Sequence, residues 1–176
     1  SMAYYSKIKN VDQIIENISN LKNPKGRFDL INFKTNKIIV DYAHTPESIS
    51  QVIKYVNPYF SKVVVLFGAG GNRDKEKRKL MGTASQLADS VIVTNDNPRN
   101  EDPIQISNDI LKGCDLSKTT VILDRKEAIT SAINELRENS VLLVLGKGHE
   151  MYQEINNSHI PFNDNDFINK TIGGLI

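Results

Sequence analysis

One stretch of this sequence decides the fold: Val63-Val64-Val65-Leu66-Phe67-Gly68-Ala69-Gly70-Gly71-Asn72-Arg73-Asp74. It opens with a continuous apolar run from Val63 to Phe67, which is typical of a strand buried on both faces of a sheet. The residues that follow are rich in glycine and charge, so they predict a loop that carries polar groups. The stretch therefore predicts a buried parallel strand with a polar loop at its carboxyl end.

Strand and helix patterns alternate on both sides of this stretch. Thr45 is suited to cap a helix and Pro46 to open it, and Pro58 ends the helix. Further strands are expected at 28–33, 38–42, 91–93, 120–123 and 141–145, further helices at 75–87, 103–112, 124–136 and 164–170, and a hairpin turn at Asn156-Asn157. This alternation predicts βαβ units, and therefore an α/β fold with a Rossmann-like, mainly parallel sheet flanked by helices.

The amino-terminal segment has a different pattern. Ile14, Ile15, Ile18 and Leu21 form one helical stripe, and Asn23-Pro24-Lys25-Gly26 then breaks the helix. We interpret residues 1–25 as a helix and linker that lead into the main domain at 26–176. Because Ser1-Met2-Ala3 resembles an expression-tag remnant, we expect the chain to be an internal piece of a longer protein.

Composition narrows the function classes. The 22 basic and 21 acidic residues give a net charge of +1, which argues against a nucleic-acid or membrane-surface binder. The basic run at 73–79 contains two acids, and a solvated helix face explains it as well as a binding site does. The single cysteine, Cys114, excludes an internal disulfide framework and a multi-cysteine metal site, so we expect a reducing, cytoplasmic compartment. No apolar stretch approaches the roughly 18 residues of a membrane span.

Four polar clusters follow four of the expected strands. They are 41–46, 68–74, 95–99 and 146–150. In parallel sheets, ligands bind beyond the carboxyl ends of the strands, so these loops predict one shared pocket. We find no Ser, Cys or metal constellation in them that would support nucleophilic or zinc chemistry.

The glycine loop could be taken for a dinucleotide fingerprint, but the fingerprint needs a small residue where Arg73 stands. We expect the glycines to let backbone approach a ligand and Arg73 to bind a carboxylate, with a plain tight turn as the alternative. The complete phosphate-loop motif, Gly-x-x-x-x-Gly-Lys-Ser/Thr, is absent from the chain, so 146–150 is not a phosphate loop.

The other loops suit a zwitterion. Asp96, Asn97 and Arg99 offer an anion, an amide and a cation, although a turn with Arg99 facing water is equally compatible. Glu150 can bind an amine, while His149 is more simply a structural hydrogen-bonding residue. Asp41 could accept from ribose hydroxyls, and His44 could donate to a phosphate oxygen.

Five stretches together resemble the Mur ligase family, and most closely its MurE branch. They are Gly26-Arg27-Phe28, Asp41-Tyr42-Ala43-His44-Thr45-Pro46, Gly70-Gly71-Asn72-Arg73-Asp74, Asp96-Asn97-Pro98-Arg99-Asn100-Glu101-Asp102-Pro103 and Gly146-Lys147-Gly148-His149-Glu150. The resemblance runs from about Ile8 to Phe167. Asn72 departs from it, since many relatives carry Asp there.

The resemblance implies the C-terminal, amino-acid-binding domain of an ATP-dependent amide ligase. Residues 1–25 would end the central ATPase domain, which would hold most of the ATP and Mg²⁺, and residues 26–176 would form the C-terminal domain. The resemblance assigns Arg27, Asp41 and His44 to the nucleotide, and it assigns Arg73, Asp96, Asn97, Arg99, Gly146 and Glu150 to the amino acid. It assigns no catalytic residue and no metal ligand within this chain.

The implied reaction adds a third amino acid to UDP-MurNAc-L-Ala-D-Glu in peptidoglycan synthesis. Arg99 resembles the form that selects meso-diaminopimelate, and meso-lanthionine would present the same groups. We expect this chain alone to be inactive, and we expect the other domains of the same polypeptide to be its partners. Two alternatives stay open, a folylpolyglutamate-synthase-like glutamate ligase domain and a non-catalytic α/β ligand-binding module.

Overall fold

The computed structural model describes residues 24–175. The helix expected near Val11–Leu21 lies outside these residues, as does most of the segment assigned to a preceding domain. Within the described part of the chain, no helix is both long enough and apolar enough to cross a membrane.

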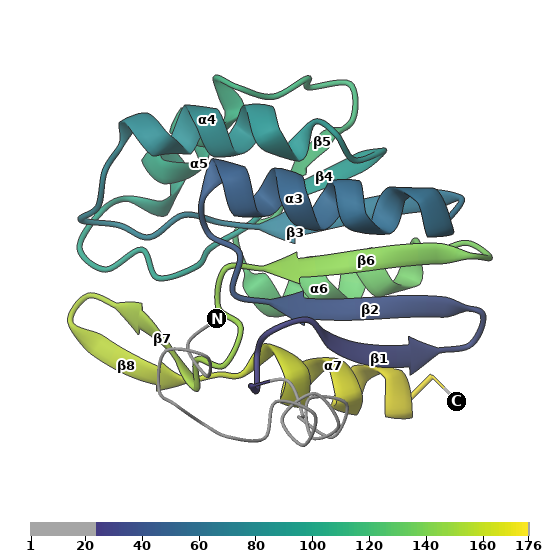
Figure 1. Cartoon of the computed structure of the whole chain (residues 1–176). Helices are drawn as coiled ribbons and strands as arrows, with labels where there is room; N and C mark the ends of the chain where they lie inside the picture. Colours follow the sequence, from purple (N-terminus) through teal and green to yellow (C-terminus); the bar gives the residue numbers. More distant parts are fainter. Residues whose placement is uncertain (1–23, 176) are drawn as a thin grey trace, which may run out of the picture.

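The centre of the fold is a six-stranded sheet in the order β1-β2-β6-β3-β4-β5 (Figure 1). The strands are β1 (Asp29–Phe33), β2 (Asn36–Asp41), β3 (Lys62–Phe67), β4 (Ser90–Val93), β5 (Thr119–Val121) and β6 (Ser140–Leu145). Every neighbouring pair is parallel except β1 and β2, which form an antiparallel hairpin. The predicted α/β fold with a mainly parallel sheet is therefore confirmed.

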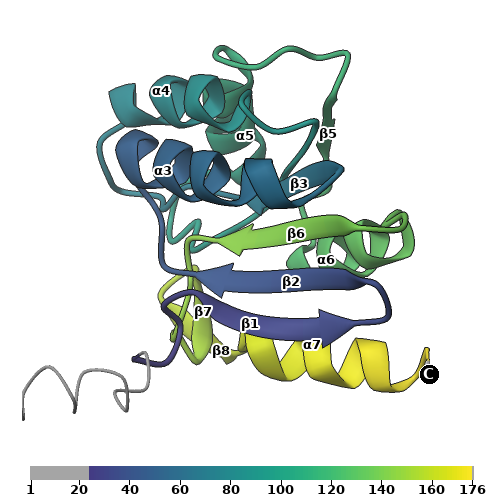
Figure 2. The same cartoon turned by 45° about the vertical axis from the view of Figure 1, so that its right-hand side comes forward.

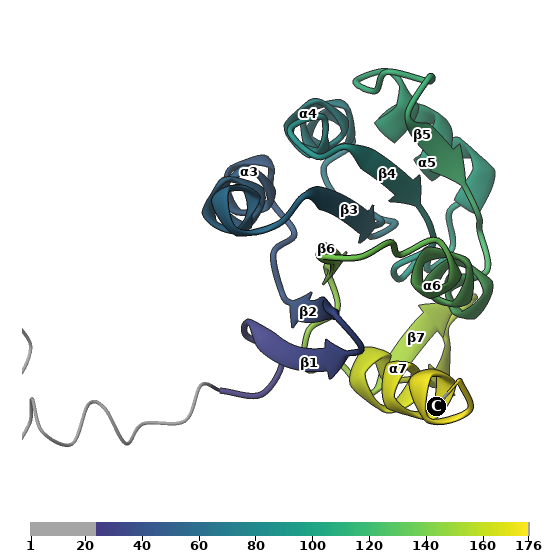
Figure 3. The same ribbon diagram turned by 90° about the vertical axis from the view of Figure 1, so that its right-hand side faces the viewer.

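Helices cover both faces of this sheet. They are α3 (Pro46–Val56), α4 (Glu76–Ser85), α5 (Pro103–Leu111), α6 (Arg125–Asn134) and α7 (Asp164–Gly173), with a short 3-10 turn, η1 (Asn57–Tyr59), after α3. Figure 3 separates α3 and α4 on one side of the sheet from α6 and α7 on the other, and Figure 2 shows α7 beside the β1 edge. The core residues of α5 belong to the same cluster as those of α3 and α4.

The central strands are apolar throughout because both of their faces are buried. Val63, Val65 and Phe67 of β3 pack into the core beneath α3, α4 and α5. Val64 and Leu66 of the same strand pack into the second core, beneath α6 and α7. Side chains alternate between the two faces of a strand, so one continuous apolar run supplies both cores.

The loops form where the sequence offers caps and turn residues. Thr45 and Ser48 form the capping box of α3, while the side chains of Asp102 and Asp124 accept hydrogen bonds at the starts of α5 and α6. Asn156 and Asn157 have φ angles of 49° and 59°, which suit the tight turn between β7 (Tyr152–Ile155) and β8 (Ser158–Pro161). Predicted and observed boundaries differ by at most three residues, as at the end of α7, where 164–170 was expected.

Candidate functional site

A cavity of about 350 Å³ lies beyond the carboxyl ends of the central strands. Seven of the predicted site residues line it: His44, Arg73, Asp96, Asn97, Arg99, Gly146 and Glu150. Arg27 and Asp41 are not among its lining residues. The cavity is of the size that binds small molecules, and the structure brings together every residue predicted to contact an amino acid.

Asp96 places a buried carboxylate at this cavity. The residue is only 8% exposed, and no described residue donates a hydrogen bond to its side chain. Burial raises the pKa of Asp96, and the nearby positive charges of Arg125 and Lys147 only partly oppose this effect. A buried anion without a partner is unfavourable, so this position favours a cationic ligand group such as an ammonium.

Gly146 leaves the space in front of this carboxylate open. Its φ is 108°, and a Cβ atom there would lie 2.5 Å from Oδ2 of Asp96. Only glycine tolerates this backbone conformation while leaving room for the carboxylate. Gly146 therefore shapes the pocket by its lack of a side chain.

Replacing Asp96 by asparagine tests the penalty of this buried charge. Because its pKa is raised in the folded state, the free energy of unfolding falls as the pH rises above the ordinary Asp range. Asp96→Asn should therefore increase the free energy of unfolding by about 1 kcal/mol or more near pH 7, and the gain should vanish near pH 3. Denaturant unfolding at the two pH values measures the difference.

The matched control for this experiment is Asp166→Asn, at an exposed position on α7. It should change the free energy of unfolding by no more than about 0.5 kcal/mol at either pH. A gain from Asp96→Asn that persists unchanged at the lower pH would contradict an origin in the ionised carboxylate.

Arg99 supplies a cation to the same cavity. Its Nε lies 2.8 Å from Oε2 of Glu154, and its Nη1 donates to the carbonyl oxygen of Gly71 at 2.8 Å. These contacts use only part of the guanidinium, whose remaining N–H groups are available for a carboxylate. Arg73 also lines the cavity and is exposed. The alternative in which Arg99 simply faces water is not what the structure shows.

The glycines of the loop after β3 approach neighbouring backbone. A Cβ atom on Gly68 would lie 2.2 Å from the Thr94 carbonyl oxygen, and one on Gly71 would lie 1.8 Å from that of Pro98. The amide of Gly71 also donates to the Asn97 carbonyl oxygen at 2.9 Å. At these two positions, close packing of two loops explains the glycines without a ligand.

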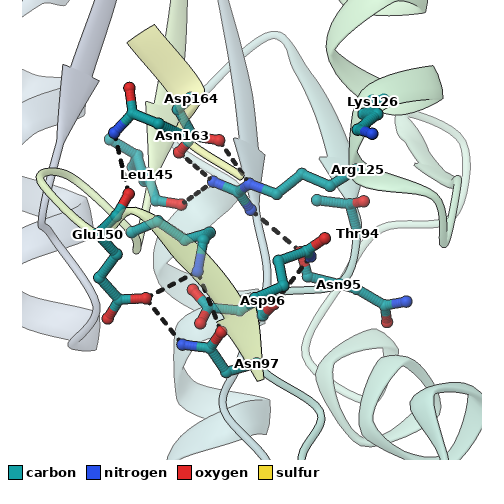
Figure 4. Close-up of polar contacts among 12 residues, drawn as sticks. Thr94, Asn95, Asp96, Asn97, Arg125, Lys126, Leu145, Glu150, Asn163 and Asp164 are labelled. Carbon is teal, nitrogen blue, oxygen red and sulfur yellow. Dashed lines mark hydrogen bonds and ion pairs between the residues drawn. The ribbon is translucent and has the colours of Figure 1, made fainter. Parts of the chain in front are cut away.

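Glu150 and Asn97 form one hydrogen-bonded group at the cavity wall (Figure 4). Nδ2 of Asn97 donates to Oε2 of Glu150 at 2.8 Å, and the buried ammonium of Lys147 donates to both side chains. Burial works to raise the pKa of Glu150, but the hydrogen bonds and positive charge of Lys147, together with Asn97, outweigh it and lower the pKa. Glu150 is therefore held as an anion.

Arg125 and Asp164 form a buried ion pair behind the cavity, which was not predicted from the sequence. Nε and Nη2 of Arg125 each donate to the carboxylate at 2.8 Å (Figure 4). Nη1 and Nη2 also donate to the carbonyl oxygens of Asn95 and Leu145, the residues that directly precede Asp96 and Gly146. The pair thereby fixes the carboxyl ends of β4 and β6.

The sequence does contain a pattern that predicts the burial of both residues. Arg125 lies four residues before Ile129, on the apolar stripe of α6, and Asp164 lies four residues before Ile168 on α7. Charged residues in line with a buried stripe predict burial, and buried charges need partners. The stripe alone could not show that the two residues pair with each other.

Arg78 was also missed, within a basic run for which a solvated helix face was a possible explanation. It is 1% exposed and donates to Glu101 at 2.9 Å and to Asp109 at 3.1 Å. The other carboxylate oxygen of Glu101 accepts a hydrogen bond from the amide of Asn72. Arg78 and Glu101 therefore join the glycine loop to the loop that carries Arg99, and the solvated-face interpretation is wrong for Arg78.

The residues assigned to the nucleotide lie around Tyr42, which lines the cavity together with His44. Both carboxylate oxygens of Asp41 accept backbone amides at 2.8 Å, from Phe28 and from Ala43. The Arg27 guanidinium lies 4.7 Å from the Tyr42 ring centroid, and Nδ1 of His44 lies 2.8 Å from the Tyr42 carbonyl oxygen. Asp41 thus holds the backbone before β1 and after β2 in place. Its predicted contact with ribose hydroxyls stays a prediction.

These observations define a class of protein: an open α/β domain with a cavity beyond the carboxyl edge of its sheet, lined by both acidic and basic side chains. Among the described residues, no group of three or more His, Cys, Asp or Glu side chains could hold a metal ion. The family model described as "Mur ligase, glutamate ligase domain" matches residues 26–148. The chain belongs to the Mur ligase family, so the predicted resemblance is confirmed.

The chain is also similar to individual relatives. It is 46% identical over 171 residues to the UDP-N-acetylmuramoyl-L-alanyl-D-glutamate–2,6-diaminopimelate ligase of Rickettsia prowazekii, covering 95% of this chain and 35% of that protein. A solved structure with the same enzyme name superimposes with a TM-score of 0.83 at 35% identity, covering 99% of this chain and 37% of the other. The chain therefore spans about a third of the length of these relatives.

A folylpolyglutamate synthase of Mycobacterium tuberculosis shares the fold. Its solved structure gives a TM-score of 0.63 at 18% identity and covers 82% of this chain and 34% of its own. At this identity the likeness concerns the architecture alone.

Proposed function

We propose that this chain is the amino-acid-binding domain of an ATP-dependent ligase that adds meso-diaminopimelate to UDP-MurNAc-L-Ala-D-Glu. The observation that supports it is the cavity in which the unpartnered Asp96 carboxylate lies with Arg99, Arg73 and Glu150. A diamino-dicarboxylic acid carries two ammonium and two carboxylate groups, which match these charges in sign. The names of the relatives point to the same substrate.

In the proposed reaction, ATP with Mg²⁺ would phosphorylate the γ-carboxyl group of D-glutamate and release ADP. An amino group of meso-diaminopimelate then attacks this acyl carbon; the C–N bond forms as the C–O bond to phosphate breaks, inorganic phosphate leaves, and the nitrogen loses a proton to solvent. The residues of this chain hold the incoming amino acid: Asp96 and Glu150 receive one ammonium group, and Arg99 binds the carboxylate at that end. Fixing the second amine in line with its target accounts for up to about 7–11 kcal/mol of the barrier at the upper range of such orientation effects.

This chain offers some side chains that could contact a nucleotide, but its described residues form no magnesium site. Arg27 and His44 are both exposed, and His44 lines the cavity, so these two side chains could contact phosphate groups. The expectations that ATP is held mainly by another domain, that this chain alone does not ligate and that it works in the cytoplasm stay predictions.

Binding by the chain tests the proposal. Isothermal titration with meso-diaminopimelate, meso-lanthionine, L-lysine and L-glutamate should show tighter binding of the first two, because only they pair both charged ends with the cavity. A ligand that lacks one of these charged groups loses its hydrogen bond to the cavity, and each such loss should weaken binding by about tenfold or more. Tightest binding of L-glutamate would favour a folylpolyglutamate-synthase-like activity, and equal binding of L-lysine and meso-diaminopimelate would contradict the proposed selectivity.

A further inference from the structure

Lys147 is a fully buried lysine immediately behind the cavity. It is 0% exposed, and its ammonium donates to Oδ1 of Asn97 at 3.0 Å, to Oε2 of Glu150 at 2.7 Å and to the carbonyl oxygen of Tyr152 at 2.7 Å. An ammonium has three protons, so this set uses all of them. The side chain is thus tied at its charged end, and none of its protons remains for a ligand.

The three acceptors come from three separate segments that meet at the cavity. Asn97 follows β4, Glu150 follows β6, and Tyr152 opens the β7–β8 hairpin. Oδ1 of Asn97 also accepts from the amide of Glu154 at 2.9 Å, which fixes the orientation of the side-chain amide. With the amide fixed, its Nδ2 faces Glu150.

This arrangement leaves one specific atom of Glu150 available. Oε2 accepts from both Lys147 and Asn97, whereas no described residue donates to Oε1. Glu150 lines the cavity, so Oε1 is the oxygen that a ligand ammonium can use. The position of that atom depends on Lys147, which holds both the carboxylate and the amide beside it.

We propose that Lys147 is a positioning residue that fixes Glu150 and Asn97 for the ammonium end of the amino-acid ligand. The inference rests on the proposed function, since it takes meso-diaminopimelate as the ligand. Without the ammonium, Asn97 Oδ1 keeps only the Glu154 amide as a donor and Oε2 of Glu150 keeps only Asn97 Nδ2. The Glu150 carboxylate then loses its charged partner and can turn away from the cavity.

Lys147→Met tests this role, because methionine keeps the unbranched chain and removes the charge. The Kd for meso-diaminopimelate, measured by isothermal titration, should rise by about tenfold or more. The matched control is Lys118→Met. Nζ of Lys118 donates to the carbonyl oxygens of Gln86 and Ala88, whose residues do not line the cavity, so its loss should leave the Kd unchanged.

A double-mutant cycle with Glu150→Gln distinguishes positioning from a general structural role. If Lys147 acts through Glu150, the double variant should bind no more weakly than the weaker of the two single variants. Losses that add independently would overturn the proposal. Equal Kd values for the unaltered chain and Lys147→Met would overturn the positioning role while leaving the proposed function intact.

A measurement on the unaltered chain covers the case in which Lys147→Met does not fold. The Lys147 ammonium should give a protected ¹H–¹⁵N signal that shifts during titration with meso-diaminopimelate and not with L-alanine. A signal that stays in place while the ligand saturates the cavity would overturn the positioning role. A complete lack of meso-diaminopimelate binding by the unaltered chain would overturn the proposed function and this inference with it.

Discussion

Replacing Arg125 by methionine is expected to lower the free energy of unfolding by about 3–5 kcal/mol. The substitution leaves Asp164, which is fully buried, as an ionised group without its bidentate partner. It also removes the donors to the carbonyl oxygens of Asn95 and Leu145. Urea unfolding followed by circular dichroism measures the loss.

Two further variants separate the ion pair from the size of the side chain. The Arg125→Met/Asp164→Asn double variant should be less destabilised than Arg125→Met alone, because no charge is then left buried without a partner. Arg137→Met removes an exposed arginine for which the described residues offer no ion pair, and it should change stability by about 0.5 kcal/mol at most. An equal loss for Arg125→Met and Arg137→Met would contradict the role of the pair.

Arg99→Ala is expected to weaken binding of meso-diaminopimelate by about ten- to a hundredfold, the equivalent of one or two charge-assisted hydrogen bonds. L-Lysine has no distal carboxylate, so its affinity should change little. The variant should therefore lose the preference for the dicarboxylic ligand, and isothermal titration with both ligands gives the ratio.

The matched control for Arg99→Ala is Arg137→Ala. Arg137 is exposed and does not line the cavity, so its replacement should leave both affinities unchanged. Retention of the preference for meso-diaminopimelate by Arg99→Ala would show that another residue, such as Arg73, selects the second carboxylate.

Much of the fold could be predicted from local patterns. The apolar runs at Val63–Phe67 and Val141–Leu145 are long and uninterrupted because these strands are covered on both faces. The helix caps at Thr45 and Asp124 are hydrogen bonds between residues at most three apart. They could therefore be predicted from the local sequence alone. The strand order could not be obtained in this way, since pairing between distant strands leaves no local pattern.

The candidate site also combines features that local sequence predicts with features that depend on distant contacts. Its loops could be predicted to meet, because the carboxyl ends of parallel strands share one edge of a sheet. The partners of Arg125 and Arg78, and the contact of Lys147 with Asn97, could not, since each of these contacts depends on where a distant segment packs. Asn97 lines the cavity and also forms hydrogen bonds with Lys147 and Glu150. These two contacts could not be predicted, because they join segments that are far apart in the sequence.

The position of β6 has a consequence for how the protein forms. This strand comes last in the chain among the six, yet it lies between β2 and β3 and pairs with both. During synthesis from the amino terminus, the β1–β2 hairpin and the β3–β4–β5 portion have no direct ladder between them until residues 140–145 have left the ribosome. The cavity, which needs loops from both portions, is consequently one of the last features to be completed, and a nascent chain that stops short of β6 lacks both the strand that joins the two portions of the sheet and the cavity residues Gly146 and Glu150.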